Sequence, residues 1–274
     1  MSENTEFEDG RYLYCAVGLS GTEPKIEAQG VDEEPVRVLA IEDIGIVVHD
    51  CDSLYDSDDM DVVRKWVLQH QQVVDAAGEA FGTPLPFQFD TILTGDDGRV
   101  REWVLDEQET ISEYLDALAG HWEYRIELRR DESKLTEELE TTDERLQELG
   151  AEIDDAGSGT EFLLEKQYDK RLTELKRERR AERSAALEDR LTDLAREVNE
   201  LGDSTTPTDE RESEELETQA RFTVLAAAKQ EETIGEMLDE VAAESGVEVR
   251  FTGPWPPYSF VPAIGGENAT ESGG

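Results

Sequence analysis

The first part of the chain begins with short runs of apolar residues that are typical of β-strands. Apolar and aromatic side chains dominate residues 11–19, and two more apolar runs, Val36–Ile41 and Ile44–His49, flank a short acidic turn. Runs of this length and composition favour strands that pack on a sheet. We therefore expect an opening strand at 11–19 and a strand pair that turns near Glu42 and Asp43.

A helical period follows these strands. From Val62 to Ala77 apolar residues recur every three or four positions, directly after Asp58 and Asp59, either of which can cap a helix. The glycine and proline residues of the segment Gly78–Pro86 end this helix.

The first domain closes with one more strand and one more helix. Residues 87–93 alternate apolar and polar positions as a strand does, Gly95–Gly98 predicts a turn, and residues 104–120 predict a second amphipathic helix. Together these elements predict an α+β domain over residues 10–120, preceded by a polar, disordered leader at 1–9.

The period changes again in the second half of the chain. Trp122–Leu128 alternates apolar and charged residues, which predicts a half-exposed strand. Two series of apolar positions then step by four and three residues, as in a coiled coil: Leu135, Leu139, Thr142, Leu146, Leu149 and Ile153, and then Leu187, Leu191, Leu194, Val198 and Leu201. We expect a helical hairpin broken within Gly150–Gly159, whose second helix runs from about Glu161 to Leu201.

Strands return after this hairpin. A polar linker at about 202–217 leads to the apolar strand Phe222–Ala228, a helix that contains Ile234 and Leu238, and the strand Val247–Phe251. The order strand, helices, strand, helix, strand predicts a modified ferredoxin-like domain over 121–263, with the coiled-coil hairpin inserted at about 131–201. One strand of that fold is not visible in the pattern. The polar, glycine-rich residues 264–274 predict a disordered tail.

Charge narrows the choice of partners. Acidic residues outnumber basic ones 68 to 26, which gives a formal net charge of −42. Such a charge is strongly self-repulsive at ordinary ionic strength but is screened near 1 M salt, where the Debye length is about 3 Å, so we interpret the surface as halophilic. Intrinsic disorder is the alternative, and the apolar strand runs argue against it. Nucleic acid and lipid membranes are unfavourable partners, since the single local basic cluster is Lys176–Arg183.

Compartment and redox state are suggested by what the sequence lacks. The opening residues have no basic and apolar signal region, and no apolar run reaches the length of about 18 residues that a membrane helix needs, so we expect a cytoplasmic protein. Cys15 and Cys51 lie in strand-like surroundings, where reduced core thiols are the favoured state.

No arrangement of residues predicts chemistry. His49, His70 and His121 are widely separated, and no nucleophile motif, phosphate loop or regular zinc-ligand spacing is present. The acidic stretch Asp50–Asp61 lacks the glycine and the fifth ligand of a calcium loop, which favours a solvated loop and a helix cap. We expect no catalytic, cofactor-binding or metal site. The less favoured alternative is an enzyme whose acidic residues surround His70 or His121.

The most specific signal is a proline-rich segment near the C-terminus, Gly253–Val261. Its three prolines fix φ and remove backbone donors, so we expect the chain to leave the sheet after Gly253 as an extended strap. Trp255 and Tyr258, three positions apart, would share one apolar face that needs cover from the protein's own domain, which we favour, or from a partner. The strap consists of Gly253, Pro254, Trp255, Pro256, Pro257, Tyr258 and Phe260, with Ser259 between the last two.

This strap resembles the ending of the GvpF/GvpL family of gas vesicle proteins. Weaker matches extend the resemblance over most of the chain: Gly10–Cys15, His70–Gln71 with Val73–Val74, Leu85–Thr91 and Glu161–Lys166. The chain has Asp90 where the family's strand motif has a glycine. Within the family, the length and the acidic composition favour the longer, haloarchaeal GvpL type.

The resemblance implies a function and carries over no catalytic site. It implies an accessory or minor structural protein that is required for gas vesicle formation and contacts the major shell protein and other accessory proteins, in the cytoplasm and at the gas vesicle. Self-association is left open. The resemblance also implies two α+β domains, the second a modified ferredoxin-like fold. The alternative function is a halophilic coiled-coil adaptor unrelated to gas vesicles.

Overall fold

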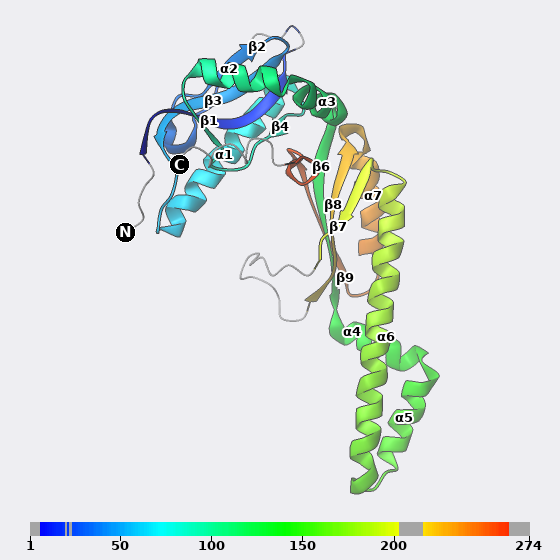
Figure 1. Ribbon diagram of the computed structural model, residues 1–274. Helices are drawn as coiled ribbons and strands as arrows, with labels where there is room; N and C mark the ends of the chain where they lie inside the picture. Colours follow the sequence, from blue (N-terminus) through cyan, green and yellow to red (C-terminus); the bar gives the residue numbers. More distant parts are fainter. Residues whose placement is uncertain (1–5, 20, 22–23, 203–215, 263–274) are drawn as a thin grey trace. The chain divides into compact units, whose positions relative to one another are not determined.

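The structure is a computed structural model that describes residues 6–19, 21, 24–202 and 216–262. The chain forms two compact units, the first made of Met1–Glu123 with Pro254–Gly274 and the second of Tyr124–Gly253 (Figure 1). Both units combine helices with a sheet, which confirms the predicted α+β class.

The first unit is built on an antiparallel sheet with the order β2-β3-β1-β4, in which β5 also pairs with β1. The central strand β1 is long and is buried from Gly10 to Val17, because its apolar and aromatic side chains there pack into the core on both faces. The strands are β1 (Glu6–Gly18), β2 (Arg37–Ile41), β3 (Ile44–Ser53), β4 (Leu85–Pro86) and β5 (Ile92–Thr94). The predicted turn between β2 and β3 is confirmed, with Glu42 in a left-handed conformation (φ 51°).

Helix α1 (Met60–Phe81) packs the apolar face predicted for it against this sheet. The Asp59 side chain accepts a hydrogen bond from the Asp61 N–H at the N-terminus, and Gly82 ends the helix at φ 88°. Val73 and Val74 are fully buried in the core that α1 shares with β1 and β3. Two shorter helices, α2 (Asp97–Asp106) and α3 (Gln108–Leu118), complete the unit.

Several boundaries of the first unit differ from the prediction. The leader is shorter, since β1 already begins at Glu6. The strand expected at 87–93 is interrupted by a turn at Phe89–Asp90, which leaves only β5 beyond it. The region of the expected Gly95–Gly98 turn starts a helix instead, because the Asp96 carboxylate caps the N–H groups of Gly98 and Arg99.

The second unit contains a sheet with the order β7-β8-β6-β9. The strands are β6 (His121–Asp131), β7 (Glu197–Glu200), β8 (Leu216–Ala227) and β9 (Val247–Trp255), and the helices are α4 (Glu132–Thr142), α5 (Glu144–Asp154), α6 (Ser158–Thr192) and α7 (Glu231–Ala242). Figure 1 shows α5 alongside the first half of α6. Leu135 and Leu139 of α4 and Leu146 of α5 are buried against Tyr168, Leu172 and Leu175 of α6.

Three expectations for the second unit are wrong. The long helix ends at Thr192 rather than Leu201, and Val198 belongs to β7, where it pairs with Val224 of β8. The helix before it breaks at Asp143, whose carboxylate caps the Leu146 N–H. β9 continues to Trp255, so the chain leaves the sheet two residues after Gly253. Of the predicted linker, 203–215 lie outside the described residues, as does the predicted tail.

Candidate functional site

The strap meets the first unit through its second half. Pro256 and Pro257 are buried, and the Tyr258 ring lies 6.5 Å from the His70 ring of α1. Ser259 donates two hydrogen bonds to the fully buried carboxylate of Glu123, from its N–H (2.8 Å) and its hydroxyl (3.0 Å). These contacts group the end of the chain with the first unit, whereas the prediction placed the whole strap in the second domain.

Trp255 and Tyr258 of the strap do not share one environment. Trp255 is 37% exposed, while the Tyr258 hydroxyl is buried without a hydrogen-bond partner among the described residues. Burial raises the pKa of the Tyr258 phenol well above its usual range. Tyr258 therefore anchors the strap by packing, and Trp255 remains available to contact something else.

The Tyr258 ring lies beside a hydrogen-bonded chain of polar groups inside the core. His70 Nε2 lies 3.2 Å from the Phe87 carbonyl oxygen and must donate to it, so in the neutral ring Nδ1 is the acceptor. The Tyr12 hydroxyl, 2.9 Å from Nδ1, donates to it and accepts from the Asp90 N–H (3.0 Å). This chain fastens the 87–90 segment to β1 and α1.

A second chain of the same kind lies beside the first. The Val31 N–H donates to the Tyr14 hydroxyl (2.7 Å), which is hydrogen-bonded to His49 Nδ1 (2.7 Å), and Nε2 of the same ring is hydrogen-bonded to the Tyr55 hydroxyl (2.9 Å). The Tyr12 and His49 rings stack at 4.8 Å and join the two chains. We call these residues the tyrosine–histidine core: Tyr12, Tyr14, His49, Tyr55, His70 and Tyr258.

The electrostatics of this core keep its histidines neutral. Burial lowers the pKa of both His49 and His70 to about 4, because the charged imidazolium would lose its hydration. Burial likewise raises the pKa values of Tyr12 and Tyr14. His70, which the alternative enzyme would use, is 3% exposed and has both ring nitrogens bonded within the protein. The arrangement is suited to holding the fold rather than to exchanging protons with a substrate.

Asp90 shows how the chain accommodates its departure from the family's glycine. Its backbone is left-handed (φ 64°), a conformation that glycine adopts freely and that Asp tolerates better than most residues. The Asp90 carboxylate accepts the Tyr55 N–H (3.1 Å), a contact that glycine could not make. Burial raises the pKa of this carboxyl group.

The basic cluster Lys176–Arg183 is occupied by contacts within the second unit. Lys176 pairs with Glu132 (2.7 Å), Arg179 with Glu138 (3.1 Å) and Arg183 with Glu244 (2.7 Å). Glu138 also pairs with Arg130, which is only 2% exposed. The cluster thus joins α6 to α4 and to the turn that follows α7, a structural use that agrees with the expectation that nucleic acid is an unfavourable partner.

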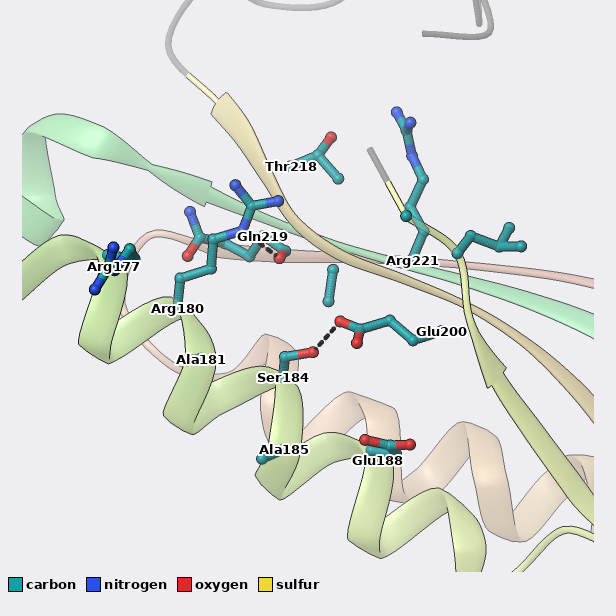
Figure 2. Close-up of a pocket in the computed structure, with 13 residues that line it drawn as sticks. Arg177, Arg180, Ala181, Ser184, Ala185, Glu188, Glu200, Thr218, Gln219 and Arg221 are labelled. Atoms are coloured by element: carbon teal, nitrogen blue, oxygen red, sulfur yellow. Dashed lines mark hydrogen bonds between the residues drawn. The ribbon is translucent and has the colours of Figure 1, made fainter. Parts of the chain in front are cut away.

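A groove of about 660 Å³ lies between α6 and the strands β7 and β8 of the second unit (Figure 2). Small side chains of α6 (Ala181, Ser184 and Ala185) form one wall. Arg180 Nε donates to the Gln219 carbonyl of β8 (2.8 Å), and the Ser184 hydroxyl donates to Glu200 (2.5 Å).

Exposed apolar side chains gather at two other places. Met60, Val67 and Leu68 of α1 are 43–69% exposed, and Phe162 and Leu163 near the start of α6 are 58% and 59% exposed.

The described residues provide neither a metal-binding cluster nor a membrane-spanning helix. In that part of the chain no group of three or more His, Cys, Asp or Glu side chains is placed to hold a metal ion, and no helix has the length and apolarity to cross a membrane. Cys15 and Cys51 are free, as predicted, and burial raises the pKa of Cys51 to about 12.

Sequence reasoning singled out the strap but missed the core beneath it. His49 and Tyr55 belong to no motif, and a lone histidine in an apolar run gives no sign of its partners. The detectable signal was indirect. Gly10–Cys15, His70–Gln71 and the strap, which resemble the family's patterns, supply residues to this core, and Leu85–Thr91 supplies the backbone groups that bond to it.

Comparison with known proteins identifies one family. Residues 10–262 match the family described as "Gas vesicle synthesis protein GvpL/GvpF". The chain is 44% identical over 265 residues to gas vesicle protein L1 of Halobacterium salinarum, covering 96% of this chain and 94% of the relative. It is 39% identical over 298 residues to gas vesicle protein L of Haloferax mediterranei, covering 96% and 91%.

Solved structures agree on the fold. The crystal structure of the gas vesicle protein GvpF from Anabaena sp. PCC7120 superposes with a TM-score of 0.73 at 18% identity, covering 92% of this chain and 98% of that one. GvpF from Microcystis aeruginosa gives a TM-score of 0.62 with the same coverage. At this identity the likeness concerns the fold alone.

Proposed function

Because the chain belongs to the gas vesicle synthesis protein GvpL/GvpF family, we propose that it is an accessory or minor structural protein required for gas vesicle formation. It acts by contacts with the major shell protein and with other accessory gas vesicle proteins. The observation that carries this proposal is the family match over residues 10–262. It is supported by relatives named gas vesicle proteins, which the chain matches over almost their whole length.

The surfaces support a role in binding proteins. The apolar side chains on α1, the apolar pair at the start of α6 and the exposed Trp255 offer contact areas on separate elements. The tyrosine–histidine core and the strap have the character of a scaffold that holds such surfaces in place. The relatives come from Halobacterium and Haloferax, in keeping with the acidic composition, and we place the protein in the cytoplasm and at the gas vesicle.

Finer features of the fold belong to the same proposal. The order of the elements in the second unit favours a modified ferredoxin-like domain, now with β7 as a fourth strand, into which α4, α5 and the first part of α6 are inserted as a helical hairpin. The leucine contacts between α4, α5 and α6 support packing of the coiled-coil kind in that hairpin.

Gene deletion tests the proposed function directly. Cells that lack the gene should contain no buoyant vesicles that collapse under pressure, and the gene supplied on a plasmid should restore them. A matched strain that carries the variant Met60→Asp/Leu68→Asp tests the role of the α1 surface. Ala80→Asp, at an exposed position of the same helix away from that face, is the control for added charge. Deletion cells that still float would overturn the proposal.

Co-purification separates this function from that of an unrelated adaptor. A tagged chain isolated in molar salt should bring down the major shell protein or other gas vesicle proteins. If the pull-downs contain no gas vesicle protein and washed vesicles do not contain the chain, the result would favour the hypothesis of an unrelated adaptor.

A further inference from the structure

The first half of α6 packs against other helices with one face and exposes the other. Figure 1 shows α5 along one side of it, and the side chains that pack against α4 and α5 are Tyr168, Leu172 and Leu175. On the opposite side lie residues that are all exposed and that recur at the spacing of three or four which keeps side chains on one face. We call them the outer face of α6: Phe162, Leu163, Lys166, Lys170, Thr173 and Arg177.

The outer face has the opposite sign of charge to the chain as a whole. It contains three basic residues and no Asp or Glu, although acidic residues outnumber basic ones 68 to 26 in the sequence. An exposed face that serves only to keep an acidic protein soluble would carry carboxylates, as the flanking positions Asp169 and Glu174 do. The reversed charge therefore needs a specific reason.

Basic residues elsewhere on α6 have a structural reason. Arg171 pairs with Asp143, the N-cap of α5, at 2.8 Å, and Lys176 and Arg179 pair with carboxylates of α4. Each of these cations joins α6 to another helix of the same unit. Their positions are explained by the fold alone.

The cations of the outer face have no such use. Among the residues that the structure describes, Lys166 and Arg177 form no ion pair, and Lys170 meets only Glu174 of its own helix, at 3.8 Å with both side chains exposed. An exposed pair one helical turn apart holds its partners weakly. Lys166 Nζ lies 4.6 Å from the centroid of the Phe162 ring. These side chains can bind a carboxylate of another molecule without breaking a contact between helices.

Apolar side chains mark one end of the outer face. Phe162 and Leu163 are 58% and 59% exposed. From there the face runs about 22 Å along α6 to Arg177, at a rise of about 1.5 Å per residue. An exposed aromatic ring beside a leucine is typical of the anchors on which protein interfaces are built. The face thus combines an apolar anchor with a row of cations.

We propose that the outer face binds an acidic amphipathic helix of a partner protein, which packs along α6 on the side away from α5. Apolar residues of that helix cover Phe162 and Leu163, and carboxylates three or four residues apart pair with Lys166, Lys170 and Arg177. A helix suits a straight face of this length on a helical hairpin. The inference rests on the proposed function, since the partner is sought among gas vesicle proteins.

Molar salt determines what each part of the face contributes. At a Debye length of about 3 Å, only charges in direct contact still attract each other. The apolar anchor therefore supplies most of the affinity. The cations select a partner helix whose carboxylates lie in register and disfavour one that carries lysines there.

Two other occupants compete with a partner protein. One is the chain's own segment 203–215, which lies outside the described residues. It is rich in carboxylates, but Pro207 is its only apolar residue, which is too little to cover Phe162 and Leu163. The other is a second copy of the chain. Both are distinguished from a partner by the experiments below.

Peptides serve as the probe for the partner. Overlapping twenty-residue peptides from the other gas vesicle proteins of the same cells are incubated with the full chain in 1 M KCl. We expect those that bind to carry Asp or Glu three or four residues apart, beside apolar residues. The variant Phe162→Ser/Leu163→Ser should weaken their binding at least about tenfold.

Reversal of charge on the outer face gives a second variant with a matched control. Lys166→Glu/Lys170→Glu should also weaken binding about tenfold or more. Arg99→Glu/Lys229→Glu changes the net charge equally at exposed positions of other elements and should leave binding unchanged.

Exchange of charge between the two molecules makes the comparison decisive. A bound peptide whose Asp and Glu are replaced by Lys should lose binding to the wild-type chain and regain it with Lys166→Glu/Lys170→Glu, because each ion pair is restored with the signs exchanged. A merely structural role of the lysines would not produce this regain. Failure to regain binding, an equal loss in the control variant, or no binding peptide at all would overturn the proposal. Binding of DNA or anionic lipid vesicles to the same lysines would overturn it too.

Hydrogen exchange of the wild-type chain makes the result independent of variant folding. The strongest peptide should slow exchange of the amides in 160–178 and leave α1 unchanged. Replacing 203–215 with a Gly-Ser linker of equal length should leave peptide binding unchanged, and a tenfold gain would assign the outer face to that segment instead. A wild-type dimer that dissociates in the lysine variant, measured by sedimentation, would assign it to a second copy.

Failure of this inference can be told apart from failure of the proposed function. Cells that need the gene for their vesicles while no peptide protects α6 would contradict the outer face as a binding site alone. Cells that float without the gene while peptides still bind there would contradict the proposed function alone.

Discussion

At the scale of single residues, Asp90 combines a strained backbone with a useful side chain. Its left-handed φ of 64° favours glycine, yet its carboxylate accepts the Tyr55 N–H. Removing that acceptor while keeping a Cβ combines two losses, since the strain remains and the N–H is left unpaired. Substitutions at this position can therefore distinguish the need for a left-handed backbone from the need for a hydrogen-bond acceptor.

Substitutions at Asp90 should therefore rank in a definite order. We expect Asp90→Ala to lower the free energy of unfolding by about 1–3 kcal/mol. Asp90→Asn, which keeps an acceptor and tolerates this conformation, should cost less, and Asp90→Gly should fall between them because it relieves strain but loses the acceptor. Denaturant unfolding in molar KCl measures the three values. An alanine variant as stable as the asparagine variant would refute this reading of the site.

The two buried histidines predict a dependence of stability on pH. Their folded pKa values of about 4 lie below the unfolded value of about 6.5, so below pH 6.5 the unfolded chain binds more protons than the folded one. Stability is complete above pH 6.5 and falls as the pH drops towards 4, by roughly 3 kcal/mol for each histidine over the whole window.

The range from pH 7 to 5.5 isolates this effect, because most carboxylates titrate lower. The double variant His49→Gln/His70→Gln should show a flatter change in the free energy of unfolding across that range than the wild-type chain. NMR of the imidazole C–H signals gives a second measurement, in which neither histidine should titrate above pH 5. Titration of either ring near pH 6.5 would contradict the neutral, bonded state.

At the scale of elements, the strap and β1 bring two tyrosines to the same core with different bonding. The Tyr12 hydroxyl joins the Asp90 N–H to His70, whereas the Tyr258 hydroxyl is buried without a partner in the part of the chain described. Removal of the hydroxyl therefore has opposite consequences at the two positions. A buried bonded hydroxyl stabilises the fold, and a buried unbonded one costs free energy.

Tyr12→Phe should lower the free energy of unfolding by about 1–3 kcal/mol, because it leaves the Asp90 N–H and His70 Nδ1 unpaired. Tyr258→Phe should be neutral or slightly stabilising, while Tyr258→Ala should cost about 3–5 kcal/mol through lost packing. Thermal and denaturant unfolding of the three variants give the comparison. Equal losses for the two phenylalanine variants would show that the strap's hydroxyl is bonded after all.

The elements that the sequence predicted are those with long apolar patterns. Strands β1, β2, β3 and β8 and helices α1 and α7 follow from runs or periods that a single stretch of chain displays. β7 escaped because its four residues contain one apolar side chain, Val198, which also fitted the period of the helix before it. Its assignment depends on pairing with β8, a contact across the linker that no local pattern encodes.

The sequence likewise predicted only part of the candidate site. Prolines and aromatics made the strap visible in the sequence, but its attachment to the first unit depends on Tyr258 and Ser259 meeting His70 and Glu123, residues more than 130 positions away. The groove beside β8 could not be anticipated, since its walls come from α6, from the end of β7 and from β8, which lie apart in the sequence.

At the scale of the whole molecule, the net charge of −42 should make stability depend strongly on salt. Many carboxylates lie on the surface with few cations between them, and their mutual repulsion favours the more expanded, unfolded chain. Raising the salt concentration from about 0.1 M to 1 M shortens the Debye length from roughly 10 Å to 3 Å and weakens that repulsion. The ion pairs of α6 weaken as well, but exposed pairs contribute only about 0–1 kcal/mol each.

We therefore expect the melting temperature to rise steeply with KCl up to about 1 M and then to level off as the repulsion becomes fully screened. NaCl at equal ionic strength should act similarly, whereas sucrose at matched osmolality, which screens no charge, should not reproduce the steep initial rise. A variant in which several exposed glutamates of α5 and α6 are changed to glutamine should melt higher at low salt and converge with the wild-type chain at high salt. If the sucrose curve matched the KCl curve, exclusion of the cosolute from the protein surface would explain the salt requirement, and the acidic surface would need another reason.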